Sequence, residues 1–139
     1  MITRLSEPEA RAILRAGLIG RLGCVYESGP YVVPINYAID GENIYIHALP
    51  GRKIEALRAN PRACLQVDRI IDEFHWSSAI AFGTYEEITD SAERERAVRA
   101  LHERFPGLTP VESVPVHDGQ SSVIIFRIHI SEITGVCEK

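Results

Sequence analysis

The sequence predicts a mainly β fold of the α+β class, a small antiparallel barrel of six strands with helices on its outside. Six short runs have the apolar pattern of β-strands, most of them are joined by short turns, and one helical segment stands between the third and fourth runs. A barrel of this size is filled by its own side chains. A sizeable ligand would therefore bind outside it, in a groove or between two copies of the chain.

Composition limits the classes of function. A chain of 139 residues can bury one core and leaves no room for a separate cofactor domain, so 1–139 is expected to form a single domain. The net charge of -4 and the pI near 5.7, without any run of basic residues, argue against nucleic acid or an anionic membrane as partner. Neither a signal peptide nor an apolar run of about 20 residues is visible. The expected location is the cytoplasm.

The first element is expected to be a short helix. Ser6 and Glu9 have the spacing of a capping box, and the apolar stripe that follows ends at Gly17. Two strands are predicted next, at 19–26 and 31–39, because apolar runs flank a cluster of turn residues.

Pro34 lies in the middle of the second of these strands. Proline cannot donate to a ladder, so this side of the strand is predicted to be an edge, a bulge or a place where something other than a strand lies. A plain edge strand and a strand whose exposed backbone meets a flat ligand both remain open. Asn36 and Tyr37 would offer an amide and an aromatic surface to such a ligand, or they are ordinary outward-facing residues.

The segment after the third strand, 43–48, carries the principal site hypothesis. The strand ends at Pro50-Gly51, where Arg52 and Lys53 open a short helix. Free backbone N–H groups, the positive end of the helix dipole and two adjacent cations are what a phosphate group needs. The alternative, two solvated surface cations, is the commoner one for a first helical turn. The rest of the chain favours the phosphate hypothesis.

The chain after this helix is expected to form a strand, a mixed connection and a long strand, at 63–68, 69–75 and 76–88. Gly83 predicts a bulge or bend of the kind that curls a sheet. Ser77 and Ser78 stand near the beginning of the long strand. They could hydrogen-bond a ligand or merely begin the strand.

A third helix follows, capped by Asp90 and Glu93. The segment 106–121 has no periodicity and is expected to be a loop, longer than most and therefore functional or mobile. It carries His117, which either touches a substrate or is an ordinary surface histidine. The last strand is predicted at 121–130, with a short tail behind it.

The three cysteines are Cys24, Cys64 and Cys137, far apart and without a CxxC pair or a histidine at metal-ligand spacing. This pattern predicts neither a zinc site nor a disulfide framework, and no metal is expected. Cys24 and Cys64 interrupt apolar strands and are expected to be small buried residues. Cys137 is expected to be an incidental thiol near the tail.

Five motifs stand in a fixed order: VVPINY, IYIHA, GRK opening a helix, NPRACLQVD and SSAIAFG. In this order the chain resembles the pyridoxamine 5'-phosphate oxidase-related family of flavin-binding split barrels, over roughly residues 5 to 135. It is most similar to the short branch that includes the 5-nitroimidazole resistance (Nim-type) proteins. The resemblance implies a single FMN-binding split-barrel domain that forms a homodimer, with two FMN molecules at the subunit interface.

The resemblance also implies site residues. Those expected along the isoalloxazine and the ribityl chain are Val33, Pro34, Ile35 and Asn36, with Tyr37 ending that strand. His47 and Ala48 fall where the family places residues near the flavin and its phosphate. Arg52 and Lys53 match the pair that binds this phosphate.

The chain departs from the family pattern at two places. Ser78, beside Ser77, takes the place of a glutamine that contacts the flavin in the oxidases proper. The C-terminal extension through which the true oxidases bind pyridoxamine phosphate is absent, and the tail ITGVCEK differs from the Gly-Lys-Arg ending common in the short branch. Oxidation of pyridoxamine phosphate is therefore not the expected activity.

The functional hypothesis is an FMN-dependent oxidoreductase that moves a hydride or electrons from NADH or NADPH to a small aromatic or nitro-bearing acceptor. The flavin would carry the chemistry, and no catalytic side chain is assigned, because no Ser-His-Asp or Cys-His arrangement is visible. The nitroreductase part rests on analogy of fold. Two alternatives are a flavin-binding protein without turnover and a haem-binding relative in which His47 or His117 is the axial ligand.

Overall fold

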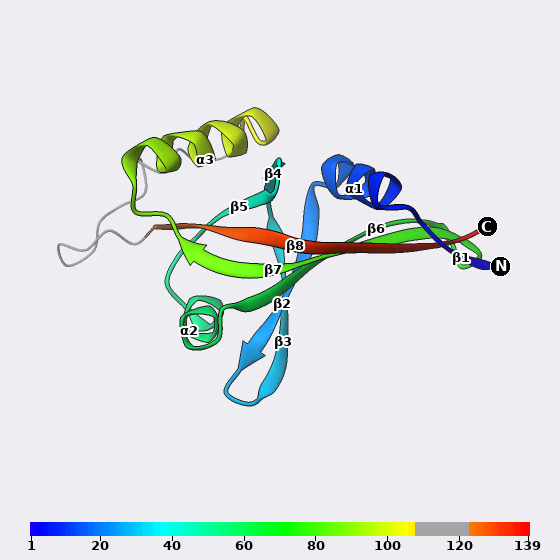
Figure 1. Cartoon of the computed structure of the whole chain (residues 1–139), viewed down its shortest axis with the longest axis horizontal. Coiled ribbons are helices and arrows are strands. Elements are labelled where there is room, and N and C mark those ends of the chain that lie inside the picture. The colour runs from blue at the N-terminus through cyan, green and yellow to red at the C-terminus, as the bar shows by residue number, and fades with distance from the viewer. Residues whose placement is uncertain (108–122) are drawn as a thin grey trace.

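The computed structural model describes residues 1–107 and 123–139 (Figure 1). The strands are β1 (Ile2–Arg4), β2 (Ile19–Tyr26), β3 (Gly29–Asn36), β4 (Ala38–Asp40), β5 (Asn43–Ala48), β6 (Arg62–Asp72), β7 (His75–Glu87) and β8 (Ile124–Glu138). The helices are α1 (Glu7–Ala16), α2 (Arg52–Ala59) and α3 (Ser91–Arg104). Most of the predicted 106–121 loop, with His117, lies outside the described residues.

All described strands belong to one antiparallel sheet with the order β3-β2-β6-β7-β8-β5-β4, and β1 pairs with β8. The two ends of this order, β3 and β4, are consecutive in the chain and meet at Tyr37. The chain passes from one edge of the sheet to the other there without a ladder between them, so the barrel is split. Helices α1 and α3 lie on one side of β7 and β8, and α2 lies on the other with the β2–β3 hairpin (Figure 1).

The predicted mainly β barrel is confirmed, with eight strands in the described part of the chain where six were expected. Tyr37 divides the predicted strand 31–39 into β3 and β4. The other additional strand is β1, which pairs with the end of β8. Strands of three residues are too short to show alternation, so neither β1 nor β4 gives a pattern that could be read from the sequence.

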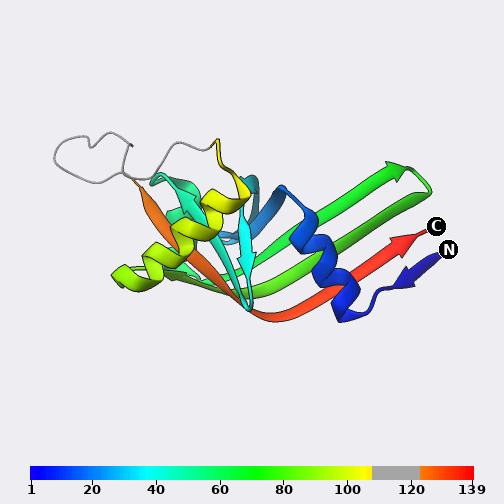
Figure 2. The same cartoon turned by 90° about the horizontal axis from the view of Figure 1, so that it is seen from above.

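The predicted connection at 69–75 is wrong, because β6 and β7 form one long hairpin whose ladder continues to the pair of Asp72 and His75. Asp72 accepts a hydrogen bond from the Phe74 N–H at 2.8 Å and so shapes the turn. Ile70 and Ile71 are 67% and 72% exposed, so this part of the hairpin has no buried face whose alternation would identify a strand. The hairpin, β1 and the end of β8 extend to the same side of the molecule (Figure 2).

The predicted last strand was also too short. β8 continues to Glu138 and pairs with the first half of β7, for example Val136 with Ser78. Cys137 is consequently 5% exposed, so it is a core residue and not an incidental thiol. The three cysteines are free thiols; Cys24 is buried as expected, whereas Cys64 is half-buried.

The core consists of two clusters on opposite faces of β5. The large residues inside the barrel include Leu14, Leu22, Tyr37, Ile44, Ile46, Ile54, Leu57, Leu65, Phe126 and Ile128. The cluster under α3 consists of Ala38, Tyr45, Ile88, Ala97, Leu101, Val123 and Ile125. Burial of each such Leu, Ile or Phe stabilises the fold by about 1.5–3 kcal/mol. β5 is therefore fixed from both sides, and the chain leaves it in a defined direction toward α2.

Candidate functional site

Helix α2 begins at an uncapped corner. Its N-cap is Gly51, which is extended and makes no side-chain hydrogen bond to the helix. Helices α1 and α3, in contrast, are capped by Ser6 and Asp90, as the sequence predicted. A Cβ atom placed on Gly51 would have no heavy atom within 4 Å, so the space before the helix is open. The first turn of α2 thus has N–H groups without a capping acceptor beside an open approach.

The two cations of this corner differ in their surroundings. Lys53 is half-buried, and Arg52 is exposed with its guanidinium 5.7 Å from the centroid of the Tyr26 ring. Tyr26 packs against Tyr31 with 5.8 Å between ring centroids. This aromatic pair joins the corner to the β2–β3 hairpin, and sequence reasoning missed it. The signal available was that both tyrosines flank the predicted turn between these two strands.

Of the possibilities predicted at Pro34, the structure has an edge: among the described strands, β3 pairs only with β2. Pro34 and Asn36 are exposed on the outer face of β3, whereas Val33 is half-buried and Ile35 is buried toward the barrel interior. The Asn36 Nδ2 donates to the Leu18 carbonyl at 3.5 Å. The free edge and outer face of β3 are therefore accessible.

Tyr37 lies in the core and does not offer its ring to the outer surface of the single chain. It is 1% exposed, and its hydroxyl donates to the Leu14 carbonyl of α1. Burial raises the pKa of Tyr37 to about 12, against the opposing effect of the Arg104 charge. In this chain Tyr37 ties the split between β3 and β4 to the first helix.

His47 and Ala48 leave β5 toward opposite faces. Ala48 is buried in the barrel core, whereas His47 is half-buried. Burial lowers the pKa of His47, and the neighbouring His102 of α3 lowers it further. The imidazole is consequently neutral at neutral pH.

The structure does not bring Ser77 and Ser78 to the α2 corner within one chain. Ser77 pairs with Arg69, seven residues along β6 from its start at Arg62, which corresponds to about 23 Å of strand. Figure 1 shows α2 and this end of the hairpin on opposite sides of the molecule. A site that uses both parts needs two copies of the chain.

Ser78 belongs to a polar cluster on the outer face of the sheet. The Gln66 Nε2 donates to the Ser78 Oγ and to the Asp68 carboxylate, both at 3.0 Å. Across the sheet, Arg21 stands opposite Gln66 on one side and opposite Pro34 on the other. The sequence did not identify Arg21 and Gln66 as part of this surface. They lie in one row with Pro34 only because of the register of β2 with β3 and β6.

A groove of about 570 Å³ adjoins this row on the outer face. Its lining consists of Gly23, Cys24, Val25, Pro30, Tyr31, Val32, Arg62, Ala63, Cys64, Phe82, Gly83, Thr84 and Ser131. The lining is mainly apolar, and its size is that of small-molecule sites in general. Because Tyr31 also packs on Tyr26, a continuous series of contacts connects this groove to Arg52.

The described residues contain no group of three or more His, Cys, Asp or Glu side chains that could hold a metal ion. None of the described helices is long and apolar enough to cross a membrane.

A sheet whose two edge strands, β3 and β4, are consecutive in the chain defines a split-barrel domain. The chain belongs to the pyridoxamine 5'-phosphate oxidase family, whose model matches residues 6–136. The resemblance inferred from the order of motifs is thus confirmed.

Similar proteins cover nearly the whole chain. An uncharacterized protein of Rhizobium meliloti (strain 1021) is 34% identical over 140 residues, with 94% of this chain and 91% of that protein covered. The crystal structure of an FAD-binding protein from Mesorhizobium loti is 32% identical, with a TM-score of 0.80 and coverage of 100% and 99%. A candidate 5-nitroimidazole antibiotic resistance protein from Bacteroides thetaiotaomicron shares the fold at 21% identity, with a TM-score of 0.78 and coverage of 99% and 87%.

Proposed function

We propose that the protein is a cytoplasmic FMN-binding flavoprotein that acts as a homodimer. In this proposal it transfers a hydride or electrons from NADH or NADPH to a small aromatic or nitro-bearing acceptor. The observation that supports it most is the α2 corner, where an uncapped helix start carries Arg52 and Lys53. The FAD-binding relative from Mesorhizobium loti, at 32% identity, supports a flavin ligand.

The electrostatics of the corner favour a bound phosphate. Cations at a helix N-terminus meet the positive end of the dipole, which is unfavourable by about 0.3–1 kcal/mol each unless an anion is present. A phosphate dianion reverses this sign, because it accepts from the N–H groups of the first turn and from Arg52 and Lys53 together. One such corner suits the single terminal phosphate of FMN, and this is our reason for proposing FMN over FAD.

The remaining residues would hold the ring system. When bound, FMN supplies the redox chemistry of the site. The outer edge of β3 has backbone groups without a partner among the described strands, and Pro34 and Asn36 present a flat surface with one amide. Ser77 and Ser78 would reach the ring from the second copy of the chain. Pro34 and the adjacent apolar side chains would exclude water from one side of the ring.

Substitution of Arg52 and Lys53 tests the corner. In Arg52→Ala/Lys53→Ala we expect FMN affinity to fall at least about a hundredfold, because two charge-assisted contacts are lost. Equilibrium titration followed by flavin fluorescence measures this, and far-UV circular dichroism checks the fold. Arg58→Ala removes one cation from the last turn of the same helix and should leave FMN affinity nearly unchanged.

Two outcomes would contradict the proposal. A double variant that purifies as yellow as the wild type would show that the corner does not hold the flavin phosphate. A red-brown preparation with a Soret band would indicate haem in place of flavin. Mass spectrometry of the released cofactor distinguishes FMN from FAD, and steady-state oxidation of NADH or NADPH with a nitroaromatic acceptor distinguishes an enzyme from a flavin carrier without turnover.

A further inference from the structure

A second cavity lies away from the α2 corner, between α1, β4 and α3. Its volume is about 460 Å³. Its lining consists of Arg15, Tyr37, Ala38, Ile39, Asp40, Arg96, Arg99, Ala100, Glu103 and Arg104. Figure 1 shows the arrangement of these three elements, with α3 and α1 on either side of β4. Apart from Tyr37, none of the residues predicted to bind the cofactor lines this cavity.

The charge of the cavity is opposite to that of the whole chain. Four arginines line it against the two carboxylates of Asp40 and Glu103, which leaves a formal charge of +2 in a chain whose net charge is -4. Like charges that share one cavity repel each other, and a bound anion removes this repulsion. The local excess of cations therefore indicates an anionic ligand.

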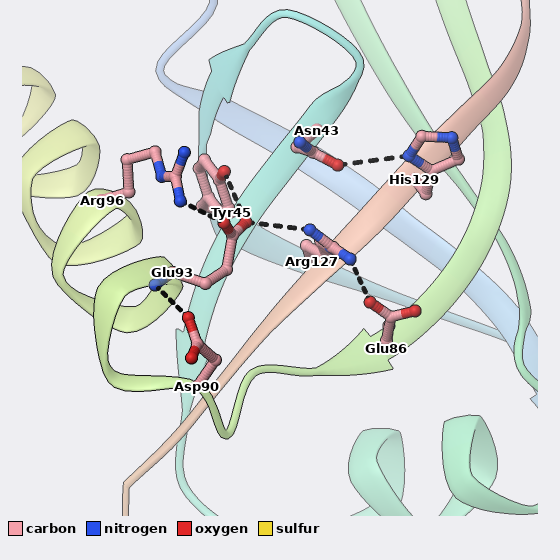
Figure 3. Close-up of polar contacts among 8 residues, drawn as sticks. All are labelled: Asn43, Tyr45, Glu86, Asp90, Glu93, Arg96, Arg127 and His129. Atoms are coloured by element: carbon pink, nitrogen blue, oxygen red, sulfur yellow. Dashed lines mark hydrogen bonds and ion pairs between the residues drawn. The ribbon is translucent and has the colours of Figure 1, made fainter.

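Two of the four guanidinium groups are already engaged. The Arg104 Nη2 donates to the Gly17 carbonyl at 2.8 Å, which holds this side chain between the ends of α3 and α1. Arg96 is paired with Glu93 at 3.1 Å (Figure 3). Arg15 and Arg99 have no ion-pair or hydrogen-bond partner within residues 1–107 and 123–139. These two donors are available to a ligand.

The rest of the lining is apolar. Ala38, Ile39 and Ala100 contribute hydrocarbon surface, and the Tyr37 hydroxyl is committed to the Leu14 carbonyl of α1. The cavity thus combines cations with an apolar surface. Its volume is within the range of about 300–1,000 Å³ that is usual for small-molecule sites.

We propose that this cavity binds a small organic phosphate with two or more negative charges, as a site separate from the flavin site. Guanidinium groups bind phosphate oxygens through paired N–H donors, and Arg15 and Arg99 approach from two different helices. Arg104 supplies a third, oriented cation. The apolar lining accommodates the organic part of the ligand.

Inorganic pyrophosphate is the probe, titrated by calorimetry into the full-length protein saturated with FMN. Binding with a Kd below about 1 mM is expected. Arg99→Gln and Arg15→Gln should each weaken it about tenfold, because each removes one charge-assisted contact. Arg94→Gln removes the same charge from the same helix but borders a different hollow, so it should change nothing.

Three results would overturn the proposal. The first is no binding of pyrophosphate, and the second is equal weakening by Arg94→Gln and Arg99→Gln, which would indicate a diffuse charge effect. The third, in a parallel titration of all variants without FMN, is binding that is lost in Arg52→Ala/Lys53→Ala but kept in Arg99→Gln, which would place the anion at the α2 corner. Arg15 and Arg99 are both exposed, so the fold should survive either substitution, and circular dichroism checks this. Loss of FMN from the α2 corner variant alone leaves this proposal intact.

Discussion

Gly83 shows how one missing side chain shapes the barrel. The register between β7 and β8 shifts at Phe82 and Gly83, and the bulged Ser131 donates its hydroxyl to the Phe82 carbonyl at 3.1 Å. A Cβ atom on Gly83 would lie 2.2 Å from the His129 carbonyl oxygen, which belongs to the backbone and cannot easily move. The bulge that the sequence predicted at this glycine is therefore present. The close approach of β7 to β8 requires a glycine at this position.

Gly83→Ala is expected to lower the free energy of unfolding by about 1–3 kcal/mol, the usual cost of overpacking. Urea denaturation followed by circular dichroism measures the change. Gly29→Ala is the matched control, because a Cβ atom there meets nothing within 4 Å and should leave stability unchanged or slightly higher. Equal stability of the two variants would contradict the close approach of β7 to β8.

At the scale of elements, one carboxylate makes the polar contacts between the start of α3 and the sheet. Glu93 accepts from the Tyr45 hydroxyl and from Arg127, both at 2.9 Å, and pairs with Arg96 at 3.1 Å (Figure 3). Arg127 also donates to Glu86 of β7. Burial raises the pKa of Tyr45, and its hydrogen bond to Glu93 adds to this. Helix, β5 and β8 are thus joined at a single point.

Glu93→Ala should destabilise the protein by about 1–3 kcal/mol, because Tyr45 and Arg127 lose their shared acceptor. The loss should be largest in α3, so hydrogen exchange resolved by peptide should show faster exchange in Ser91–Arg104 than in the sheet. Glu95→Ala, an exposed change on the same helix, should stay within about 0.5 kcal/mol of the wild type. If α3 exchanged at the same rate in Glu93→Ala as in Glu95→Ala, Glu93 would not anchor the helix.

This network also marks the limit of prediction from sequence. The start of α3 depends on four adjacent residues, so Asp90 and Glu93 are enough to predict it. Asp90 caps the helix as expected. The second task of Glu93 depends on Tyr45 and Arg127, which are distant in the chain and become neighbours only through the pairing of β5 with β8. No local pattern carries that information.

The same division holds for the whole molecule. The alternation of apolar and polar residues predicted the barrel. The turn at Pro50-Gly51 and the two cations after it predicted the α2 corner, because both signals span only a few adjacent residues. The split at Tyr37 and the row that contains Arg21 follow from strand order, which alternation does not encode. The long reach of the β6–β7 hairpin was missed because its exposed end has no buried face.

The distance between the α2 corner and Ser78 leads to a prediction about the dimer. If each flavin site combines the corner of one chain with Ser78 of the other, Arg52→Ala/Lys53→Ala and Ser78→Tyr should each abolish both sites of their own homodimer. A mixed dimer of the two variants keeps one chain with an intact corner facing one chain with an intact Ser78. We therefore expect one FMN per mixed dimer.

Differently tagged chains, purified in tandem, would give the mixed dimer for flavin absorbance and mass spectrometry. Its recovery of one FMN is expected because both defects fall on the same site and leave the other site whole. If each site were built within one chain, both sites of the mixed dimer would carry one defect and no FMN would return. The first outcome is the expected one, because α2 and the part of the β6–β7 hairpin in which Ser77 pairs with Arg69 lie on opposite sides of one chain (Figure 1).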